Sequence, residues 1–473
     1  MLKNFRYIWL IGLGVTLLII GVPMLIALRD TTPTTPSPWQ AIRATPQPVD
    51  HAALISGEFE TGSDVTRACL TCHAEAGQQM LHSVHFTWQA EPVVFGERDQ
   101  PIGVGKINLF NNFCIGIQSN WKGCTRCHAG YGWSEAEYDF ANVENVDCLV
   151  CHDQSGTYLK AAAGQPAQGV DLLVAARSVG APTRRNCGTC HFNGGGGNAV
   201  KHGDLDESMY FPNPTLDVHM GKLNFECTTC HVTTDHIISG RSLTSSADVL
   251  TRQISCTDCH AENTHQDARL NAHTASVACQ TCHIPAGARR DATKMLWDWS
   301  TAGQDLAEDP HHYLKMKGSF EYEQNFVPQY FWFNGLSDRY LLGDPIDPSL
   351  PTVLNPLAGN LNDPNAKIYP FKVHLGNQPY DKVYNYLLQP NVVGGYWVHF
   401  DWDKAFVAGA QATGLAYSGQ YGFAPTVMYY MQTHQVAPKA DALQCADCHG
   451  ESTRMDWQAL GYMGDPLIWG GRK

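Results

Sequence analysis

Cysteine and histidine are the residues most able to do chemistry in this 473-residue chain, which holds 17 cysteines and 21 histidines. Cys69-Leu70-Thr71-Cys72-His73 is a CxxCH motif, and seven further copies follow it. Two thiols one helical turn apart reach the two vinyl groups of one porphyrin, and the adjacent histidine supplies an imidazole to the iron. The pattern therefore predicts eight covalently bound c-type haems. The attachment pairs are Cys69/Cys72, Cys124/Cys127, Cys148/Cys151, Cys187/Cys190, Cys227/Cys230, Cys256/Cys259, Cys279/Cys282 and Cys445/Cys448, and the proximal histidines are His73, His128, His152, His191, His231, His260, His283 and His449.

Zinc sites or dithiol redox pairs are the alternative use of such cysteines, but neither explains a histidine after every pair. Thioether attachment fits an extracytoplasmic, oxidising compartment. Charged residues make up only 16% of the chain and the net charge is −13, so we expect no nucleic-acid partner. One cysteine, Cys114, belongs to no motif.

Thirteen histidines lie outside the motifs, and any of them can supply a sixth iron ligand, since neutral imidazole is abundant at pH 7. Two imidazoles saturate an iron and make an electron carrier, whereas catalysis needs one iron with an open or weakly held position. We expect the distal ligands in segments that flank motifs or lie among aromatics, although the sequence alone does not pair each with an iron. The selected residues are His85, His219, His236, His265, His273, His374 and His434.

The elements that position these ligands must be built largely around haems, because seven motifs crowd into Cys69–His283. We expect residues 51–290 to form a haem-rich region with haems 1 to 7, made of short helices after each CxxCH and irregular loops. Residues 291–473, rich in aromatics and proline, are expected to wrap the haem cluster and end in haem 8; a separate fold there is the alternative. The predicted fold class is mainly α with much irregular loop, a multihaem cytochrome c with one N-terminal transmembrane helix.

An uncharged run of 22 residues, Tyr7 to Leu28, follows Lys3 and Arg6. It is long enough to span about 30 Å of hydrocarbon as a helix, with the basic residues on the cytoplasmic side. We therefore expect residues 1–28 to be an uncleaved inner-membrane anchor, residues 29–50 a Pro/Thr-rich linker, and the body to lie in the periplasm. A cleaved signal peptide and a soluble periplasmic protein are the alternative.

Several segments resemble the octahaem tetrathionate reductase family of c-type cytochromes, and together they touch most of the chain from Cys69 to His449. The resemblance is specific because it includes residues that hold no haem, above all the odd cysteine and a Lys-His-Gly-Asp sequence. The segments are Asn111–Cys114, Cys124–Trp133, Cys190–Phe192 with Gly194–Gly197, Lys201–Asp206, Asn271–Pro285, Pro370–Asp381 and Ala437–His449.

The resemblance implies seven bis-histidine haems and an active second haem, attached at Cys124 and Cys127 with His128, whose distal ligand is a lysine. Lys201 is the candidate for that lysine, with Lys160 as second choice; a solvated surface lysine is the alternative for Lys201. A free lysine has a pKa of about 10.4, so its neutral form costs roughly 4.6 kcal/mol at pH 7 and it is an easily displaced ligand.

The odd cysteine, Cys114, is either a thiol beside the active haem, able to form a mixed disulfide with a sulfur substrate, or an inert buried thiol. Asp204 and Asp235 are possible acidic members of the pocket, and structural hydrogen bonding is the alternative for each. The candidate catalytic group is therefore Lys201, Cys114, His128 and Asp204.

The function implied is a periplasmic reductase that uses a small anionic or nitrogenous substrate: tetrathionate, or nitrite or hydroxylamine. Its electrons would come from a membrane quinol-linked donor or a periplasmic cytochrome. Two alternatives stay open, a non-catalytic electron conduit with every iron six-coordinate, and an octahaem enzyme that oxidises hydroxylamine.

Overall fold

The computed structural model describes residues 49–94, 98–113, 115–240 and 254–472, together with Leu13 and Thr16. By its internal contacts the chain divides into two compact units, Met1–Pro46 and Gln47–Lys473. All helices and strands named here belong to the second unit.

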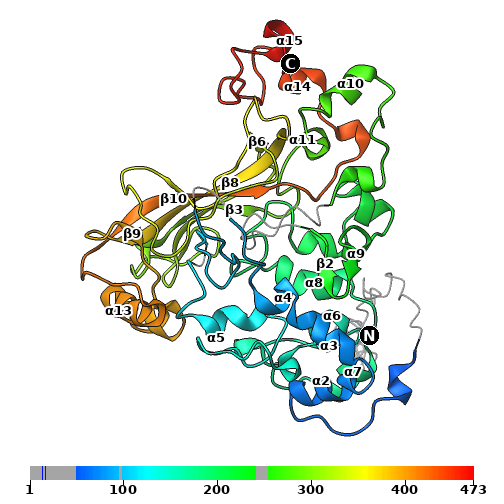
Figure 1. Ribbon diagram of the computed structural model, residues 1–473, viewed down its shortest axis with the longest axis vertical. Helices are drawn as coiled ribbons and strands as arrows, with labels where there is room; N and C mark the ends of the chain where they lie inside the picture. The colour runs from blue at the N-terminus through cyan, green and yellow to red at the C-terminus, as the bar shows by residue number, and fades with distance from the viewer. Residues whose placement is uncertain are drawn as a thin grey trace, which may run out of the picture. The chain divides into compact units, whose positions relative to one another are not determined.

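Short helices carry most of the haem motifs, and they lie together along one side of this unit (Figure 1). The first of them begins with a reciprocal cap, in which the Thr61 hydroxyl accepts from the Asp64 N–H and the Asp64 carboxylate accepts from the Thr61 N–H. The α-helices of the described residues, with or without a haem motif, are α2 (Gly62–Leu70), α3 (Ala74–Leu81), α4 (Val84–Thr87), α5 (Trp121–Cys124), α6 (Leu149–His152), α7 (Leu172–Arg177), α8 (Arg184–His191), α9 (Cys227–Cys230), α10 (Ala268–His273), α11 (Cys279–His283), α12 (Trp397–His399), α13 (Trp402–Thr413), α14 (Cys445–Cys448) and α15 (Pro466–Trp469).

An eight-stranded sheet occupies the haem-poor region, with the order β4-β5-β3-β8-β10-β7 and with β6 and β9 also paired to β8. The long strands β8 and β10 run antiparallel and place His374 opposite Met428. Strands β1 and β2 form a separate antiparallel pair. The strands are β1 (Thr233–Thr234), β2 (Ile237–Ile238), β3 (Thr293–Asp298), β4 (Tyr313–Leu314), β5 (Gly318–Glu323), β6 (Gln329–Phe333), β7 (Thr352–Val353), β8 (Lys367–Asp381), β9 (Tyr386–Leu387) and β10 (Tyr421–Met431).

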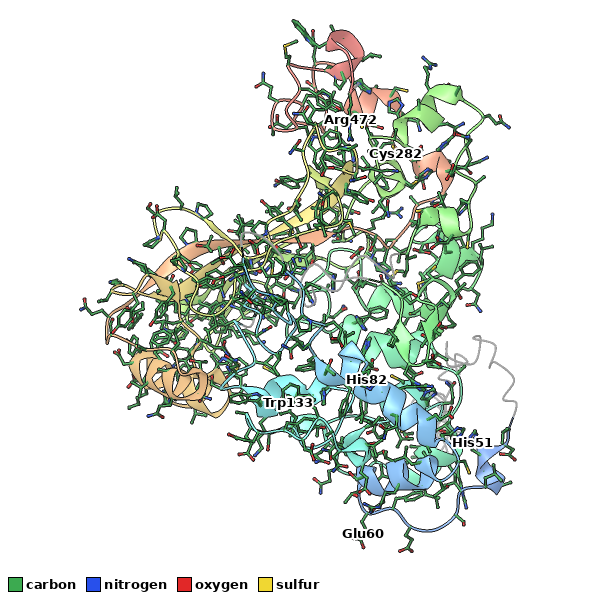
Figure 2. All side chains as sticks on the ribbon, viewed as in Figure 1. His51, Glu60, His82, Trp133, Cys282 and Arg472 are labelled. Atoms are coloured by element: carbon green, nitrogen blue, oxygen red, sulfur yellow. The ribbon has the colours of Figure 1, made fainter. Side chains whose placement is uncertain are left out.

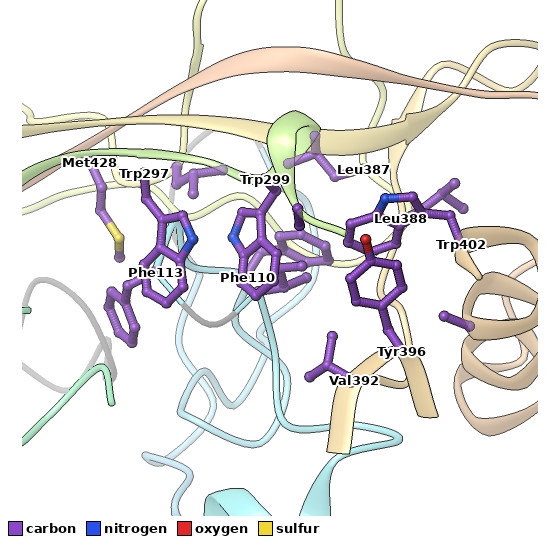
Figure 3. Close-up of a cluster of buried hydrophobic side chains, with 14 of the residues drawn as sticks. Phe110, Phe113, Trp297, Trp299, Leu387, Leu388, Val392, Tyr396, Trp402 and Met428 are labelled. Carbon is purple, nitrogen blue, oxygen red and sulfur yellow. The ribbon is translucent and has the colours of Figure 1, made fainter. Parts of the chain in front are cut away.

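The largest apolar core lies between this sheet, helix α13 and the segment that precedes the second haem motif (Figure 3). Trp297 and Trp299 stack with ring centres 4.9 Å apart, and both are fully buried. Phe110 and Phe113 enter the same cluster from the other side. The sheet therefore fixes Phe110 and Phe113, which precede the second haem motif, although its strands lie far from that motif in the sequence.

The expectation of a mainly α fold is wrong, because the sheet is a major part of the structure and strand makes up 17% of the chain against 29% helix. A segment with no haem to pack on must satisfy its backbone N–H and C=O groups within itself, and paired strands do this. In β10 the buried residues alternate from Ala424 to Tyr430, as expected for a strand with one face packed on a core.

The expected transmembrane helix finds no support. Apart from Leu13 and Thr16, its residues lie outside the described part of the chain. Within the described residues, no helix has both the length and the apolar character needed to cross a membrane.

Candidate functional site

Each CxxCH motif lies within a short helical turn or directly next to one. The fourth motif ends helix α8, and the seventh motif is helix α11 itself. At the first motif, α2 ends at Leu70 and α3 begins directly after His73. The helices thus mostly carry the motifs, where the sequence predicted helices after them. A helical turn puts thiols three residues apart on one face, which is the arrangement that a single porphyrin requires.

The sixth motif differs from the other attachment sites in its helical turn and in its exposure. Its helical turn is a 3-10 turn that ends at Asp258, so that Cys259 lies outside the turn as its C-terminal cap. Cys256, Cys259 and His260 are all exposed, whereas every other motif has at least one partly buried cysteine. A reciprocal cap between Ser255 and Asp258 satisfies the local backbone groups of this turn. A haem attached at Cys259 is therefore the one that protein side chains cover least at its thioether sulfurs.

The motifs also contact one another through their cysteines. Four contacts join different motifs, and their sulfur atoms stand for the thioether sulfurs of the haem-loaded protein. They place the first motif beside the third, the second beside the fourth, the fourth beside the fifth, and the sixth beside the seventh. The contacts are Cys69–Cys148, Cys127–Cys190, Cys187–Cys227 and Cys256–Cys279.

Seven of the eight motif histidines face a second histidine, with ring centres 6.1 to 6.4 Å apart. A metal–imidazole bond of about 2.0 Å and a ring nitrogen about 1.1 Å from the ring centre put two trans imidazoles on one metal about 6.2 Å apart. The residues therefore fit bis-histidine haems. The pairs are His73 with His51, His152 with His236, His191 with His85, His231 with His434, His260 with His219, His283 with His265, and His449 with His273.

Six of the seven histidines selected from the sequence occur in these pairs, and His374 does not. His374 lies on β8, fully buried, with its ring centre 6.3 Å from that of Tyr430. Among the described residues, neither of its ring nitrogens has a hydrogen-bond partner. The seventh pair uses His51 instead, which follows the linker and which no local pattern singled out.

The second motif differs from the others, because its histidine faces aromatic rings and, within the described residues, no second histidine. His128 is fully buried, and its ring packs against Phe86, at 5.2 Å, and Trp133, at 4.9 Å. Trp88 closes the same cage and lies 5.3 Å away. Burial lowers the pKa of His128 to about 3, so its imidazole stays neutral, and its Nε2 contacts the backbone carbonyl oxygen of Phe86.

Lys201 lies beside this motif, where it could supply the distal ligand that no histidine provides. Its ammonium is 5.7 Å from the centre of the Phe113 ring and close enough to Cys127 to feel its charge. Burial lowers the pKa of Lys201 to about 7, and the neighbouring Lys106 lowers it as well. The neutral amine that an iron requires is then available at pH 7 for almost none of the roughly 4.6 kcal/mol that a free lysine needs.

Lys160, the second choice for this ligand, is already engaged elsewhere. Its ammonium donates to the carbonyl oxygens of His128, at 2.5 Å, and Gly130, at 3.0 Å, and forms an ion pair of 2.6 Å with Asp147. A lysine with three such partners in a buried site loses all of them if it turns to an iron. The geometry therefore favours Lys201 as the lysine that could hold a sixth position.

The two candidate acids are placed beside distal histidines instead of beside His128. Asp204 accepts from the backbone N–H of His434 at 2.8 Å and lies 3.2 Å from Nδ1 of its ring. Asp235 accepts from the amide of Gln79, whose own oxygen contacts Nδ1 of His236. A carboxylate or amide on the outer nitrogen fixes the tautomer and orientation of a ligating imidazole. Cys114, the remaining candidate, lies outside the described residues.

One buried lysine, Lys372, holds the backbone at Lys201, and the sequence did not predict this contact. Lys372 donates to the carbonyl oxygens of Val200 and Lys201, both at 3.1 Å, and to the Thr293 hydroxyl at 2.6 Å. It thereby fixes the backbone that carries Lys201. Nothing in the sequence of β8 marks Lys372 as part of a site. The pairing of β8 with β3 brings it next to Thr293 and to the backbone of Lys201.

Comparison with known proteins bears on this arrangement. Residues 213–284 match the family model of cytochrome c7 and related cytochrome c, and residues 294–452 match the model of bacterial cytochrome c. An uncharacterized protein of Archaeoglobus fulgidus is 24% identical over 256 residues, which cover 43% of this chain and 84% of that protein. The crystal structure of an octaheme cytochrome c from Shewanella oneidensis is 47% identical, with a TM-score of 0.83, and covers 89% of this chain and 98% of its own.

The chain belongs to the octahaem tetrathionate reductase family of c-type cytochromes. Membership in this octahaem family supports covalently bound c-type haems, and the solved relative suggests the same number as the eight motifs. It also supports a role in multihaem electron transfer or reduction. The bis-histidine spacing of seven pairs is independent of this comparison, because it comes from the side chains of this chain alone.

Proposed function

We propose that this protein is a periplasmic octahaem reductase whose substrate reacts at the second haem motif. The observation that carries the proposal is the difference between the motif histidines. Seven of them face a second histidine, whereas His128 faces none among the described residues and the buried amine of Lys201 lies near Cys127 of the same motif. A bis-histidine site carries electrons, and a site with a displaceable ligand can also admit a substrate.

The haem, when bound at Cys124 and Cys127, supplies an iron that passes electrons and exchanges its sixth ligand. Lys201, as a neutral amine, would be the residue that holds that position, and its lowered pKa would let the same side chain take up a proton at pH 7. The ammonium can then pair with an anionic group or donate its proton to a leaving group. Phe86, Trp88 and Trp133 surround the buried ring of His128 and hold this imidazole in place.

A small anion is the substrate class that the charges favour. Lys201 and Lys106 lie close together, and Lys106 stacks 4.1 Å above the Trp88 ring beside His128. Two neighbouring cationic side chains attract a dianion more than a neutral molecule. We propose tetrathionate, which accepts two electrons and breaks its central S–S bond to give two thiosulfates. Nitrite and hydroxylamine are the competing substrates for an exchangeable haem iron.

Electrons would enter at the exposed motifs and come from a membrane quinol-linked donor or a small periplasmic cytochrome. Both cysteines of the sixth motif, Cys256 and Cys259, are exposed, whereas both cysteines of the second motif are partly buried. Figure 2 shows that Cys282, of the seventh motif, and Trp133, beside the second, lie in different parts of the haem-carrying region. Cysteine contacts link the second motif to the fourth and the fourth to the fifth, and Cys230 of the fifth motif lies close enough to Cys259 of the sixth for their charges to interact, so the fourth and fifth motifs would connect the two. The other exposed attachment cysteines are Cys72, Cys230 and Cys445.

Electron paramagnetic resonance of the haem-loaded protein during a ligand titration tests the proposal. We expect one low-spin signal that is not bis-histidine and that nitrite or sulfite displaces. Lys201→Ala should alter that signal alone and reduce viologen-linked turnover of tetrathionate at least tenfold, whereas the exposed Lys222→Ala should change neither. Lys201→His should convert the signal to a bis-histidine one and abolish turnover in a folded protein.

Eight bis-histidine signals in the wild type, all inert to added ligands, would overturn the reductase function and favour the electron conduit. Turnover of nitrite or hydroxylamine without turnover of tetrathionate would keep the site and overturn the sulfur substrate.

A further inference from the structure

Lys160 and Asp147 form a buried ion pair directly behind the second haem motif. The two charged atoms are 2.6 Å apart, and the side chains are 4% and 0% exposed. A buried pair is costly to form, because both ions lose their hydration. Such a pair is stable only if the other hydrogen-bonding groups of both side chains also have partners, and the neighbouring residues supply them.

The carboxylate of Asp147 is held by three further donors. The hydroxyls of Tyr131 and Tyr158 each donate to it at 2.9 Å, and the backbone N–H of Val150 donates at 3.0 Å. Together with the Lys160 ammonium, these donors fix the carboxylate in one orientation. The pair is therefore a fixed dipole with a defined direction, and not a mobile surface contact.

The direction of this dipole is set by the second motif. Lys160 donates to the carbonyl oxygens of His128 and Gly130, so its positive end meets the backbone of the proximal histidine. Its charge also acts on the ring of His128 and on Cys127. The negative end belongs to Asp147, which precedes Cys148, the first attachment cysteine of the third motif.

We propose that the Lys160–Asp147 pair is a positioning element that holds the backbone of His128 and sets the reduction potential of the second haem relative to its neighbours. Reduction adds one electron to a haem. A fixed positive charge on the proximal side of a site that excludes water stabilises the added electron, and the buried carboxylate offsets part of that effect. The inference requires a haem at the second motif, and it holds whether or not that haem reduces a substrate.

Potentiometric titration of the haem-loaded protein, followed by electron paramagnetic resonance, tests the proposal through opposite substitutions. Lys160→Met leaves the hydrogen-bonded carboxylate uncompensated, so the reduction equilibrium of the second haem should fall at least tenfold, which is 59 mV for a one-electron couple. Asp147→Asn should shift the same haem by a similar factor in the opposite direction. The double variant should return close to the wild-type potential.

Two controls separate this electrostatic role from general damage to the fold. Lys160→Arg keeps the charge and should keep the potential of the second haem within threefold of its wild-type equilibrium. Lys404→Met breaks an exposed ion pair, 3.1 Å from Asp401, and should shift no haem. Shifts of the same sign in both single variants, or equal shifts of all haems, would overturn the proposal. So would an unchanged second haem in variants that retain all haems by absorbance. Variants that show the predicted shifts and still turn over substrate would support the role of the ion pair. If the predicted shifts do not occur, the proposed reductase function is not affected.

Discussion

Asp204→Asn tests whether Asp204 supports a distal histidine. The carboxylate accepts from the N–H groups of Thr433, at 2.6 Å, and His434, at 2.8 Å, and it is 1% exposed. Burial alone raises the pKa of Asp204, but the hydrogen bond and charge of His434 prevail and lower it from 3.8 to about 2. A shift of almost two units corresponds to about 2 kcal/mol of folding free energy at neutral pH.

The sign of the pH dependence follows from this depressed pKa. Because the folded protein holds the carboxylate as an anion, Asp204 stabilises the fold at every pH above the unfolded value of 3.8. That contribution is lost as the pH falls through the window from 3.8 to about 2. The difference in stability between wild type and variant should therefore be constant at neutral pH and disappear towards the lower end of that window.

Denaturant unfolding of the haem-loaded protein, followed by circular dichroism, measures the predicted loss. Asp206→Asn is the matched control, since Asp206 is equally buried but burial raises its pKa. Its charged form therefore opposes folding once the pH exceeds the unfolded value, and its removal should leave stability unchanged or increase it. An Asp204→Asn protein as stable as wild type at pH 7, with an unaltered signal from the haem at His231, would refute the reasoning.

Three further predictions concern the haem ligands and their support. His51→Ala should remove one bis-histidine signal from the paramagnetic resonance spectrum, whereas His374→Ala should remove none; the reverse result would reassign the distal ligand of the first haem. Gly164→Ala should lower the unfolding free energy by about 1–3 kcal/mol, because Gly164 has φ +73° and an added Cβ would lie 2.4 Å from a backbone carbonyl oxygen. Phe86→Ala should cost about 3–5 kcal/mol in the same unfolding assay and broaden the signal of the haem at His128, against which the ring stacks.

Local spacing was enough to predict the haem attachment sites of this protein. A CxxCH motif is complete within five residues, so eight haem attachments and eight proximal histidines follow without knowledge of the fold. The resemblance to one family also rested on short segments, and the comparison with the Shewanella oneidensis structure confirmed it.

Distal ligands are different, because the iron takes its sixth ligand from wherever the chain returns. His434 faces His231 across about two hundred residues, and His51 was missed because nothing in its neighbourhood distinguishes it. His374 was selected because it lies in an aromatic segment, yet β8 turns its ring towards Tyr430. The same aromatic segments were expected to wrap haems, and they form a sheet because their backbone must pair with itself.

The sequence by itself determined the cofactor, the number of its attachment sites and the family. Only the tertiary structure decided that Lys160 is bound by Asp147 while Lys201 remains beside the second motif, although both residues are lysines that follow it in sequence. It also decided that the attachment site at Cys259 is exposed while that at Cys127 is partly buried, although the two motifs look alike in sequence. The physical reason is that ligand availability and exposure depend on burial and on competing partners. These arise from strands and loops far apart in the chain, and no local pattern records them.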